Sequence, residues 1–436
     1  MKTTFAMARH LESRTGFGAP PRALQRMVGA RWEALIDDRL KHLRLEAATA
    51  PPSWIDDAPP RAGERRDEGF RQEVRERAFE LKRWWFAELL TTPSPMTEQL
   101  TMFWSNHFTS SVRKVKWPPF LHRQNATLRR LAATDVRSLL RAVIRDPAMI
   151  LYLDNHTNHA DAPNENFARE FFELFTLGEG EASESDIKGA ARAFTGYRVN
   201  RATGAFRFAS GAHDDGLKTV FGQSGHFDGD AIIELALAHP RSAPFLVSKL
   251  WRAFISPEPD PKQVAAWAAE LRRSDWALKP LLRTMFTSSA FTAADAHGVL
   301  IKSPVELFVG ALRTFEVELP EEGGMAIVRG LRRLGQDLFD PPNVKGWVGG
   351  PHWITTNTLL LRQSMLQRAL DSRPFRRANR GRTLASWLGC EDGDAGDLVT
   401  FASQVLSPLA PVSRIDARSD GELIAQLLAD PTYQLK

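Results

Sequence analysis

Residues 164–178 read Asn164-Glu165-Asn166-Phe167-Ala168-Arg169-Glu170-Phe171-Phe172-Glu173-Leu174-Phe175-Thr176-Leu177-Gly178. At 100° per residue, an α-helix places four large apolar side chains of this stretch on one arc and four polar side chains on the opposite arc. The apolar arc holds Phe167, Phe171, Leu174 and Phe175, and the polar arc holds Asn166, Arg169, Glu170 and Glu173. The stretch therefore predicts one amphipathic helix whose polar side carries a candidate site.

Helical spacing of apolar residues dominates the rest of the chain and predicts a mainly α fold, a large irregular multi-helix bundle. Residues 20–48, for example, are expected to form one helix opened by a proline pair. A small β-hairpin insertion is predicted near residues 197–210, and Gly/Pro-rich loops connect the helices. We expect a single helical domain over residues 1–370, then an Arg-rich linker and a small C-terminal helical tail over residues 371–436.

The composition narrows the class of protein. A chain of 436 residues can bury a sizeable core, and its net charge of +5 comes from dispersed basic residues. No nucleic-acid-binding signature accompanies them, so binding to nucleic acid is disfavoured. Cys390 is the only cysteine, which excludes an intrachain disulfide and a cysteine metal cage. No membrane span is expected, and the N-terminal stretch lacks a signal-peptide pattern, which predicts a cytoplasmic location.

Two polar pairs are candidates to meet the polar arc. Asn106-His107 ends an aromatic-rich helix, and His213-Asp214 lies in a glycine-rich loop. Imidazole and carboxylate groups bind metals, so His107, His213 and Asp214 are candidate ligands of one divalent metal ion. A histidine among aromatic residues is more often a hydrogen-bonded core residue, and an adjacent His and Asp are a weak signal without further ligands. The common motifs of nucleotide hydrolases, serine esterases and zinc proteases are absent.

Two glutamates of the polar arc have a spacing that allows two interpretations. Glu170 and Glu173 lie one helical turn apart, as carboxylates that share a proton or a divalent cation would. The same spacing is common on solvated helix faces, where it has no function. Arg169 is also placed to pair with Glu165 or Glu173, which would make an internal ion-pair network that orders the bundle.

Further candidates lie on basic side chains and in a loop rich in Pro, Gly and Trp, residues 340–353. Arg169, Arg192 and Lys218 are candidate anion-binding residues, with ordinary exposed side chains as the alternative. Trp347 is either an anchor that pins the loop to the core or a stacking platform for a sugar or peptide, and its large buried area favours the anchor. Asn343 is expected to hold the backbone of its own turn.

Taken in order, these segments resemble the family known as domain of unknown function 1800. The matching motifs span roughly residues 10–365 and comprise residues 104–108, 153–155, 164–170, 173–178, 191–196, 213–218 and 341–347. The resemblance implies a mostly helical bacterial protein whose activity has no settled assignment. It also implies a partner of the domain of unknown function 1501 family, which resembles alkaline phosphatases and sulfatases, because genes of the two families often lie side by side. Many members look exported, which implies a periplasmic or envelope location.

Two functions are consistent with these observations. The first is a metal- or carboxylate-assisted hydrolase acting on a glycan or on a phosphorylated or sulfated polymer. Its catalytic residues would be Glu170, Asp214, His107 and His213. Its substrate-binding residues would be Asn106, Asn164, Asn166, Arg169, Arg192, Lys218, Asn343 and Trp347. The second is a non-catalytic helical adaptor or maturation partner of a phosphatase/sulfatase-like protein. A hydrolase needs unpaired polar groups around an accessible cavity, whereas an adaptor would have them paired internally.

Overall fold

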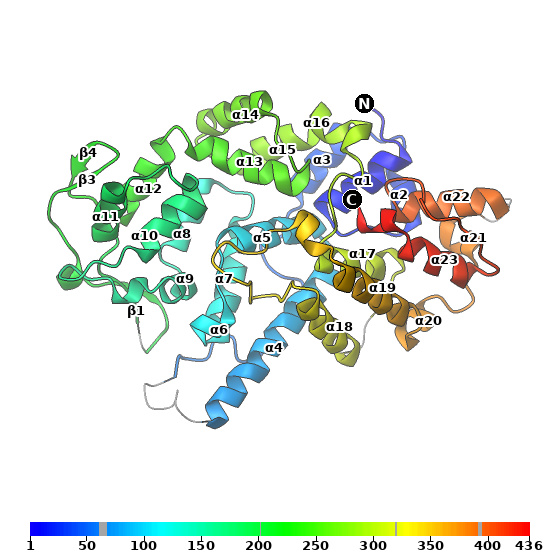
Figure 1. The fold of residues 1–436 in the computed structure, drawn as a ribbon, viewed down its shortest axis with the longest axis horizontal. Helices are drawn as coiled ribbons and strands as arrows, with labels where there is room; N and C mark the ends of the chain where they lie inside the picture. The colour runs from blue at the N-terminus through cyan, green and yellow to red at the C-terminus, as the bar shows by residue number, and fades with distance from the viewer. Residues whose placement is uncertain (61–67, 201, 319–320, 391–394) are drawn as a thin grey trace.

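The structure is a computed structural model that describes residues 1–60, 68–200, 202–318, 321–390 and 395–436. These residues are mostly helical and include two small antiparallel β-sheets, which confirms the predicted mainly α fold class (Figure 1). Within the described part of the chain, none of the helices combines the length and the apolar character needed to span a bilayer.

The helices and strands follow in three groups along the chain. The first group is α1 (Phe5–Thr15), α2 (Pro21–Met27), α3 (Trp32–Lys41), α4 (Glu68–Thr91), α5 (Pro95–His107), α6 (Val112–Val115), α7 (Pro118–Leu131), α8 (Val136–Val143) and α9 (Pro147–Tyr152). The second is α10 (Asn166–Glu170), a π-helix (Phe171–Thr176), α11 (Glu184–Ala193), β1 (Tyr197–Val199), β2 (Phe206–Phe208), β3 (Lys218–Val220), β4 (Gln223–Gly225), α12 (Gly229–Ala238), α13 (Ser242–Phe254) and α14 (Pro261–Arg273). The third is α15 (Leu278–Thr287), α16 (Ser289–Thr292), α17 (Pro304–Thr314), α18 (Glu321–Arg333), α19 (Thr356–Leu370), α20 (Arg373–Ala378), α21 (Leu384–Leu388), α22 (Ala395–Leu406) and α23 (Asp420–Ala429).

Many of these helices begin at side chains that satisfy the free N–H groups of the first turn. Asp135 accepts a hydrogen bond from Ser138 N at 2.7 Å at the start of α8. At the start of α17, Ser303 and Glu306 form a capping box in which each side chain accepts the other residue's backbone N–H. Local sequence thus sets where these helices begin.

The single helix expected over residues 20–48 is wrong, because the chain leaves the helical conformation between α2 and α3. There Lys2 and Arg31 form an antiparallel bridge, and Gly29 N donates to the Thr3 carbonyl at 2.9 Å. Backbone groups that would bond within one helix pair instead with the N-terminal segment. A long-range pairing of this kind overrides the local helical pattern.

The predicted hairpin near residues 197–210 is confirmed, and the chain contains a second one. In the first, β1 pairs antiparallel with β2, and Tyr197 lies opposite Phe208. In the second, β3 pairs with β4 around Phe221 and Gly222, whose φ angles are 50° and 73°. Two-residue turns of this type usually carry Asn-Gly, so a bulky Phe221 gave no turn signal. Asp186 stabilises the turn by accepting a hydrogen bond from Phe221 N at 2.7 Å.

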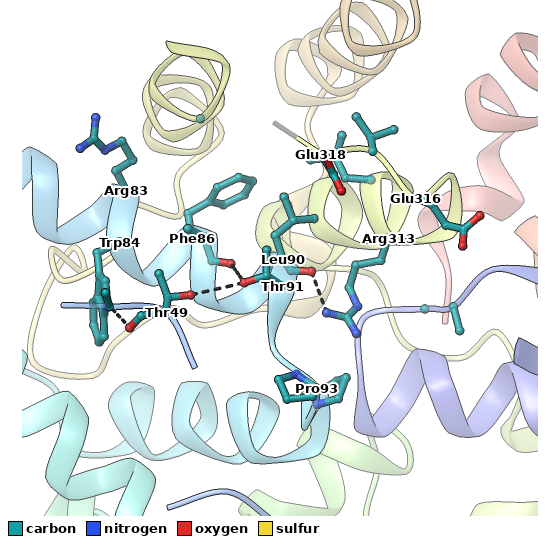
Figure 2. Close-up of a pocket in the computed structure, with 18 of the residues that line it drawn as sticks. Thr49, Arg83, Trp84, Phe86, Leu90, Thr91, Pro93, Arg313, Glu316 and Glu318 are labelled. Atoms are coloured by element: carbon teal, nitrogen blue, oxygen red, sulfur yellow. Dashed lines mark hydrogen bonds between the residues drawn. The ribbon is translucent and has the colours of Figure 1, made fainter. Parts of the chain in front are cut away.

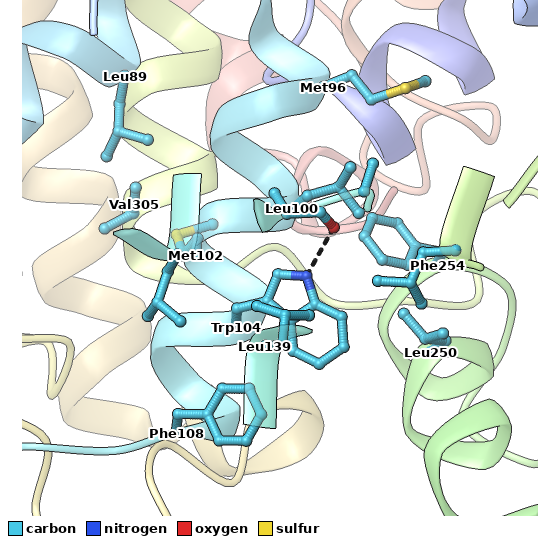
Figure 3. Packing of buried hydrophobic residues seen from close by; sticks show 14 of the residues in the cluster. Leu89, Met96, Leu100, Met102, Trp104, Phe108, Leu139, Leu250, Phe254 and Val305 are labelled. Carbon is cyan, nitrogen blue, oxygen red and sulfur yellow. Dashed lines mark hydrogen bonds between the residues drawn. The ribbon is translucent and has the colours of Figure 1, made fainter. Parts of the chain in front are cut away.

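Helix α5 runs through the hydrophobic core and fixes the position of the residues at its C-terminal end. Trp104 is 1% exposed and packs among Leu100, Leu139 and Phe254, as Figure 3 shows. Its indole N–H donates to the Ala132 carbonyl at 2.8 Å, so the polar edge of the ring is also satisfied. Three residues later in this rigid setting, the chain reaches His107.

A buried ion pair joins α5 to α7. Arg129 and Glu98 are 2% and 1% exposed, and the guanidinium meets both carboxylate oxygens at 2.5 and 2.9 Å. Trp85 of α4 donates its indole N–H to the same carboxylate at 2.9 Å. Both charges are therefore compensated inside the core.

The C-terminal helices pack against the start of the chain. Gln25 of α2 donates to the Leu388 carbonyl of α21 at 3.1 Å. Ile301 and Leu435 form an antiparallel bridge next to α17. Figure 1 shows α21 and α22 beside α2, with the C-terminus next to α1. Residues distant in sequence therefore meet around α1.

Candidate functional site

The loop of residues 340–353, which we call the tryptophan loop, is held at its start by the N-terminal end of α6. Asp340 is buried, and its carboxylate accepts hydrogen bonds from Ser111 Oγ at 2.6 Å and from Arg113 Nε at 2.8 Å. Just before it, Phe339 has a φ of 59°, which bulky residues rarely adopt. Such strain persists only where the surroundings fix the backbone, as the Asp340 contacts do here.

The end of α5 holds the same loop further along. The Asn106 side chain accepts from Trp347 N at 2.7 Å and donates to the Trp347 carbonyl at 3.1 Å. Gly346 has a φ of 77°, and a Cβ there would lie 2.3 Å from Asn106 Oδ1, so the contact requires glycine. Asn343 holds its own turn by accepting from Lys345 N at 2.9 Å. Trp347 is 7% exposed, which is the position of an anchor.

The predicted amphipathic helix begins as α10 and then widens into the π-helix. Leu177 N donates to the carbonyl of Phe172, five residues earlier, at 2.8 Å. Such single π-turns are rare and often lie at functional sites. At the end of the helix, the carbonyls of residues 174–175 accept hydrogen bonds from side chains of two other helices.

His107 provides one of these side chains. Its Nε2 donates to the Phe175 carbonyl at 3.0 Å, so Nε2 carries the proton and Nδ1 is the bare nitrogen. Among the described residues, Nδ1 has no hydrogen-bond partner. The ring is 3% exposed and packs against Trp104 and Phe108. Burial, and then the charge of Lys249, holds the pKa of His107 well below its usual value, so the imidazole stays neutral.

Lys249 on α13 provides the other side chain, and sequence reasoning missed it. Its Nζ donates to the Leu174 carbonyl at 3.2 Å and lies 5.1 Å from the centre of the Phe245 ring. Burial, followed by the charge of Arg252, lowers the pKa of Lys249 to about 8. One lysine within an amphipathic helix normally faces solvent, so no local signal distinguished it.

Glu170 lies partly buried at the junction of α10 and the π-helix. It has no hydrogen bond or ion pair with the residues that the structure describes. Burial first, and then the neighbouring charge of Glu173, raises the pKa of Glu170, while Lys345 and Arg169 act in the opposite direction. This carboxyl group therefore keeps its hydrogen-bonding capacity and takes up a proton more readily than usual.

Arg169 is surrounded by carboxylates. It meets Glu184 through two hydrogen bonds of 2.8 Å and reaches Glu165 at 3.2 Å and Glu173 at 3.6 Å. Nearby, Lys345 of the tryptophan loop pairs with an exposed glutamate at 2.7 Å. The glutamates around these two cations form a surface that we call the acidic face: Glu165, Glu170, Glu173, Glu179 and Glu184.

A second polar cluster joins α11 to the loop after β2. Arg192 contacts both oxygens of Asp214, with Nε to Oδ2 at 2.5 Å and Nη2 to Oδ1 at 3.2 Å. Asp214 N donates to Thr195 Oγ1 at 2.7 Å, and Gly216 N donates back to Asp214 Oδ1 at 2.9 Å. The hydrogen bond from Arg192 is the main cause of the lowered pKa of Asp214. The carboxylate is therefore ionised and already paired.

The other predicted residues of this loop also bond to its own backbone. His213 Nδ1 lies 3.0 Å from the Thr195 carbonyl, and the buried Lys218 donates to the Gly216 carbonyl at 3.0 Å. Among the described residues, the hydrogen-bond and ring partners of His213 are not those of His107. Across the described ranges, no three His, Cys, Asp or Glu side chains are grouped so that they could hold a metal ion.

Asparagines connect the start of the α10 helix to its surroundings. Asn164 N donates to Asn158 Oδ1 at 2.9 Å, and Asn166 N donates to Asn164 Oδ1 at 3.0 Å. The Asn166 side chain donates to the Leu153 carbonyl at 3.1 Å. Asn158, which sequence reasoning missed, also donates to the Ala191 carbonyl of α11 at 2.9 Å. These amides fix the loop that precedes α10.

A family model matches nearly the whole chain, including the acidic face and the cluster around Arg192 and Asp214. The family described as "Protein of unknown function (DUF1800)" matches residues 10–435. The chain belongs to this family. The match continues through the C-terminal helices, beyond the motifs that end near residue 365. No curated protein and no solved structure matches the chain.

This DUF1800 chain also has a groove that no predicted site residue lines. Its volume is about 980 Å³, and it lies between α4, residues 49–53 and the end of α17 (Figure 2). Trp84 donates to the Thr49 carbonyl at 3.2 Å on one wall, and Arg313 donates to the Leu90 carbonyl at 2.8 Å on another. The volume lies within the range of ligand sites. Its walls come from distant segments, so sequence patterns did not reveal it.

Proposed function

We propose that this DUF1800 chain is a non-catalytic helical adaptor or maturation partner of a phosphatase/sulfatase-like protein. The supporting observation is that residues of the family motifs use their polar groups on the chain itself. Asn106 forms hydrogen bonds with the tryptophan loop, and His107 forms one with the π-helix. Asp214 accepts hydrogen bonds from Arg192. A hydrolytic site needs such groups turned toward a substrate, with hydrogen-bonding capacity left over.

The contact surface of this adaptor is the acidic face. Five glutamates there surround Arg169 and Lys345, so negative charge is in excess on a chain whose net charge is +5. Complementary charge guides association and selects partners. The partner would therefore present a cationic surface, and its class, the domain of unknown function 1501 family, comes from the family resemblance alone.

Titration calorimetry with a protein of that family from the same genome tests the proposal. We expect a complex with wild type and at least tenfold weaker binding by Glu184→Lys, which reverses a charge of the acidic face. Glu258→Lys, an exposed site outside this face, is the matched control and should bind like wild type. Added salt should weaken the complex, because charges at the interface are screened. Absence of a complex at low salt would refute the adaptor.

A carboxylate-assisted hydrolase is the second candidate, and Glu170 favours it. Its pKa is raised, and it makes no hydrogen bond within the described chain, as a general acid or base requires. The test is an assay of hydrolysis on glycan, phosphate-ester and sulfate-ester substrates. Activity that is lost in Glu170→Gln but kept in Glu258→Gln would show that the chain is a hydrolase and would contradict the adaptor proposal. A metal-assisted form would also show one equivalent of divalent metal by elemental analysis, lost in His213→Ala.

A further inference from the structure

Arg9 lies on the buried face of α1 and is 8% exposed. Its guanidinium forms no hydrogen bond or ion pair with any described residue, and its Nε is sealed from solvent. Burial lowers the pKa of Arg9 to about 10, which still leaves it charged at neutral pH. The described part of the chain therefore supplies no counter-charge for this arginine. A buried charge without such a partner strongly destabilises a folded protein.

The groups around this guanidinium add positive charge. Lys302 donates to the Tyr433 carbonyl at 2.8 Å, and its Nζ lies 3.8 Å from the centre of that ring. Burial, and then the charge of Arg9, lowers the pKa of Lys302 to about 7, so Lys302 carries part of a positive charge at neutral pH. Arg362 is fully buried, and two of its three nitrogens have no hydrogen-bond partner among the described residues. Glu306, one of the acids of this region, is already paired with Lys436. The local excess of charge is therefore positive.

A small cavity lies against these residues. Its volume is about 40 Å³, and Arg9, Ser13 and Lys302 line it. One water needs roughly 10–15 Å³ of such volume, so the space fits about three water-sized groups, which is the size of a carboxylate. Glu12 also lines the cavity, but it pairs with Arg39 at 2.5 Å. The cation in the wall that lacks a partner is Arg9.

We propose that this cavity is a binding site for a carboxylate group, held by the guanidinium of Arg9 with Lys302 beside it. A planar guanidinium donates two parallel N–H groups to the two oxygens of a carboxylate. The carboxylate belongs either to a free small acid or to the end of a larger ligand. The remainder of the larger ligand would lie toward the 980 Å³ groove, which is next to the cavity: the two share the wall residues Glu12, Gly18 and Ala19.

Calorimetric titration of the full chain with acetate and with hexanoate, at constant ionic strength in chloride buffer, tests this site. The variants are Arg9→Met, which removes the charge, and Ser13→Leu, which fills the cavity and keeps the charge. Arg26→Met is the matched control, because Arg26 is exposed on α2. We expect saturable binding by wild type and Arg26→Met, and at least tenfold weaker binding by the other two variants. Tighter binding of hexanoate than acetate would assign a larger ligand, and equal binding a free small acid.

Thermal unfolding provides a second measurement. Acetate should raise the Tm of wild type and leave that of Arg9→Met unchanged, because only the charged site binds the ligand. Without acetate, Arg9→Met should be at least as stable as wild type, since an uncompensated charge has been removed. Absence of saturable binding to wild type, or equal binding by Ser13→Leu and Arg26→Met, would overturn the proposal even if Arg9→Met fails to fold.

Discussion

Arg129 and Arg9 are both buried, at 2% and 8% exposed, but they differ in whether a carboxylate compensates the charge of the guanidinium. Arg129 meets both oxygens of Glu98, whose carboxylate also accepts the indole N–H of Trp85. Arg9 has no such partner among the described residues. In the region of α4, α5 and α7, the chain balances its own charge. Around α1, the balance depends on a group from outside the chain, so stability there is linked to binding.

The largest effect on stability is expected when the buried ion pair between Arg129 and Glu98 is broken. Glu98→Gln keeps the shape of the side chain and leaves Arg129 charged and uncompensated in the core. The free energy of unfolding should fall by about 3–5 kcal/mol, as for other broken buried pairs. Urea unfolding at pH 7 measures this. Asp37→Asn is the control, because it removes an exposed pair with Arg283 and should change stability by less than about 1 kcal/mol. Equal losses in both variants would show that burial does not govern the pair.

Acidification should lower the free energy of unfolding through two histidines of the region around α1, His10 and His297. Burial first, and then Arg14 and the neighbouring His297, lowers the pKa of His10 to about 2. Burial first, and then Arg9, lowers the pKa of His297 to about 4. Below about pH 6.5 the unfolded chain protonates these histidines while the folded chain does not, so stability falls as pH falls. At pH 5, His10 should reduce stability by about 2 kcal/mol relative to pH 7, and the less buried His297 should reduce it by less, because solvent screens its charge.

His10→Gln isolates the larger part of this effect. Glutamine does not titrate in this range and can still donate to the Phe291 carbonyl, as His10 Nε2 does at 2.9 Å. The loss of stability between pH 7 and pH 5, measured by urea unfolding, should shrink by about 2 kcal/mol in this variant. The same pH dependence in the variant and in wild type would mean that His10 is protonated in the folded protein.

A smaller effect on stability is expected at the contact between Gly346 of the tryptophan loop and Asn106, which involves no charged group. Gly346→Ala combines a positive φ with a close approach to Asn106 Oδ1, and should cost about 1–3 kcal/mol. Gly29→Ala is the matched control, because Gly29 also has a positive φ, 82°, and a Cβ there would meet nothing within 4 Å. The difference between the two Tm values measures the close approach alone. Equal Tm losses would mean that Asn106 moves aside.

Sequence reasoning recovered what depends on local pattern and missed what depends on distant partners. The mainly α class and the hairpin near residues 197–210 follow from periodicity and turn residues, and both are confirmed. The π-helix was not predictable, because its end is completed by His107 and Lys249, which lie about 70 residues away on either side. Likewise, nothing in the sequence around Arg9 distinguishes it from Arg129, since pairing is decided by other helices. Asn106 belongs to a motif that the sequence shows, but its contact with Trp347 could not be predicted, because Trp347 lies 241 residues further along the chain.

The smallest effect is expected at Arg169, which has three carboxylates around it but is 33% exposed. Arg169→Gln should reduce stability by no more than about 1 kcal/mol, because solvent screens such pairs. The loss should shrink further in 1 M salt, where the Debye length is about 3 Å. The substitution should also raise the pKa of Glu170, since Arg169 holds it down, and NMR titration of that carboxyl group measures the change. A loss as large as that of Glu98→Gln, insensitive to salt, would instead place Arg169 with Arg129 among the charges that the fold itself balances.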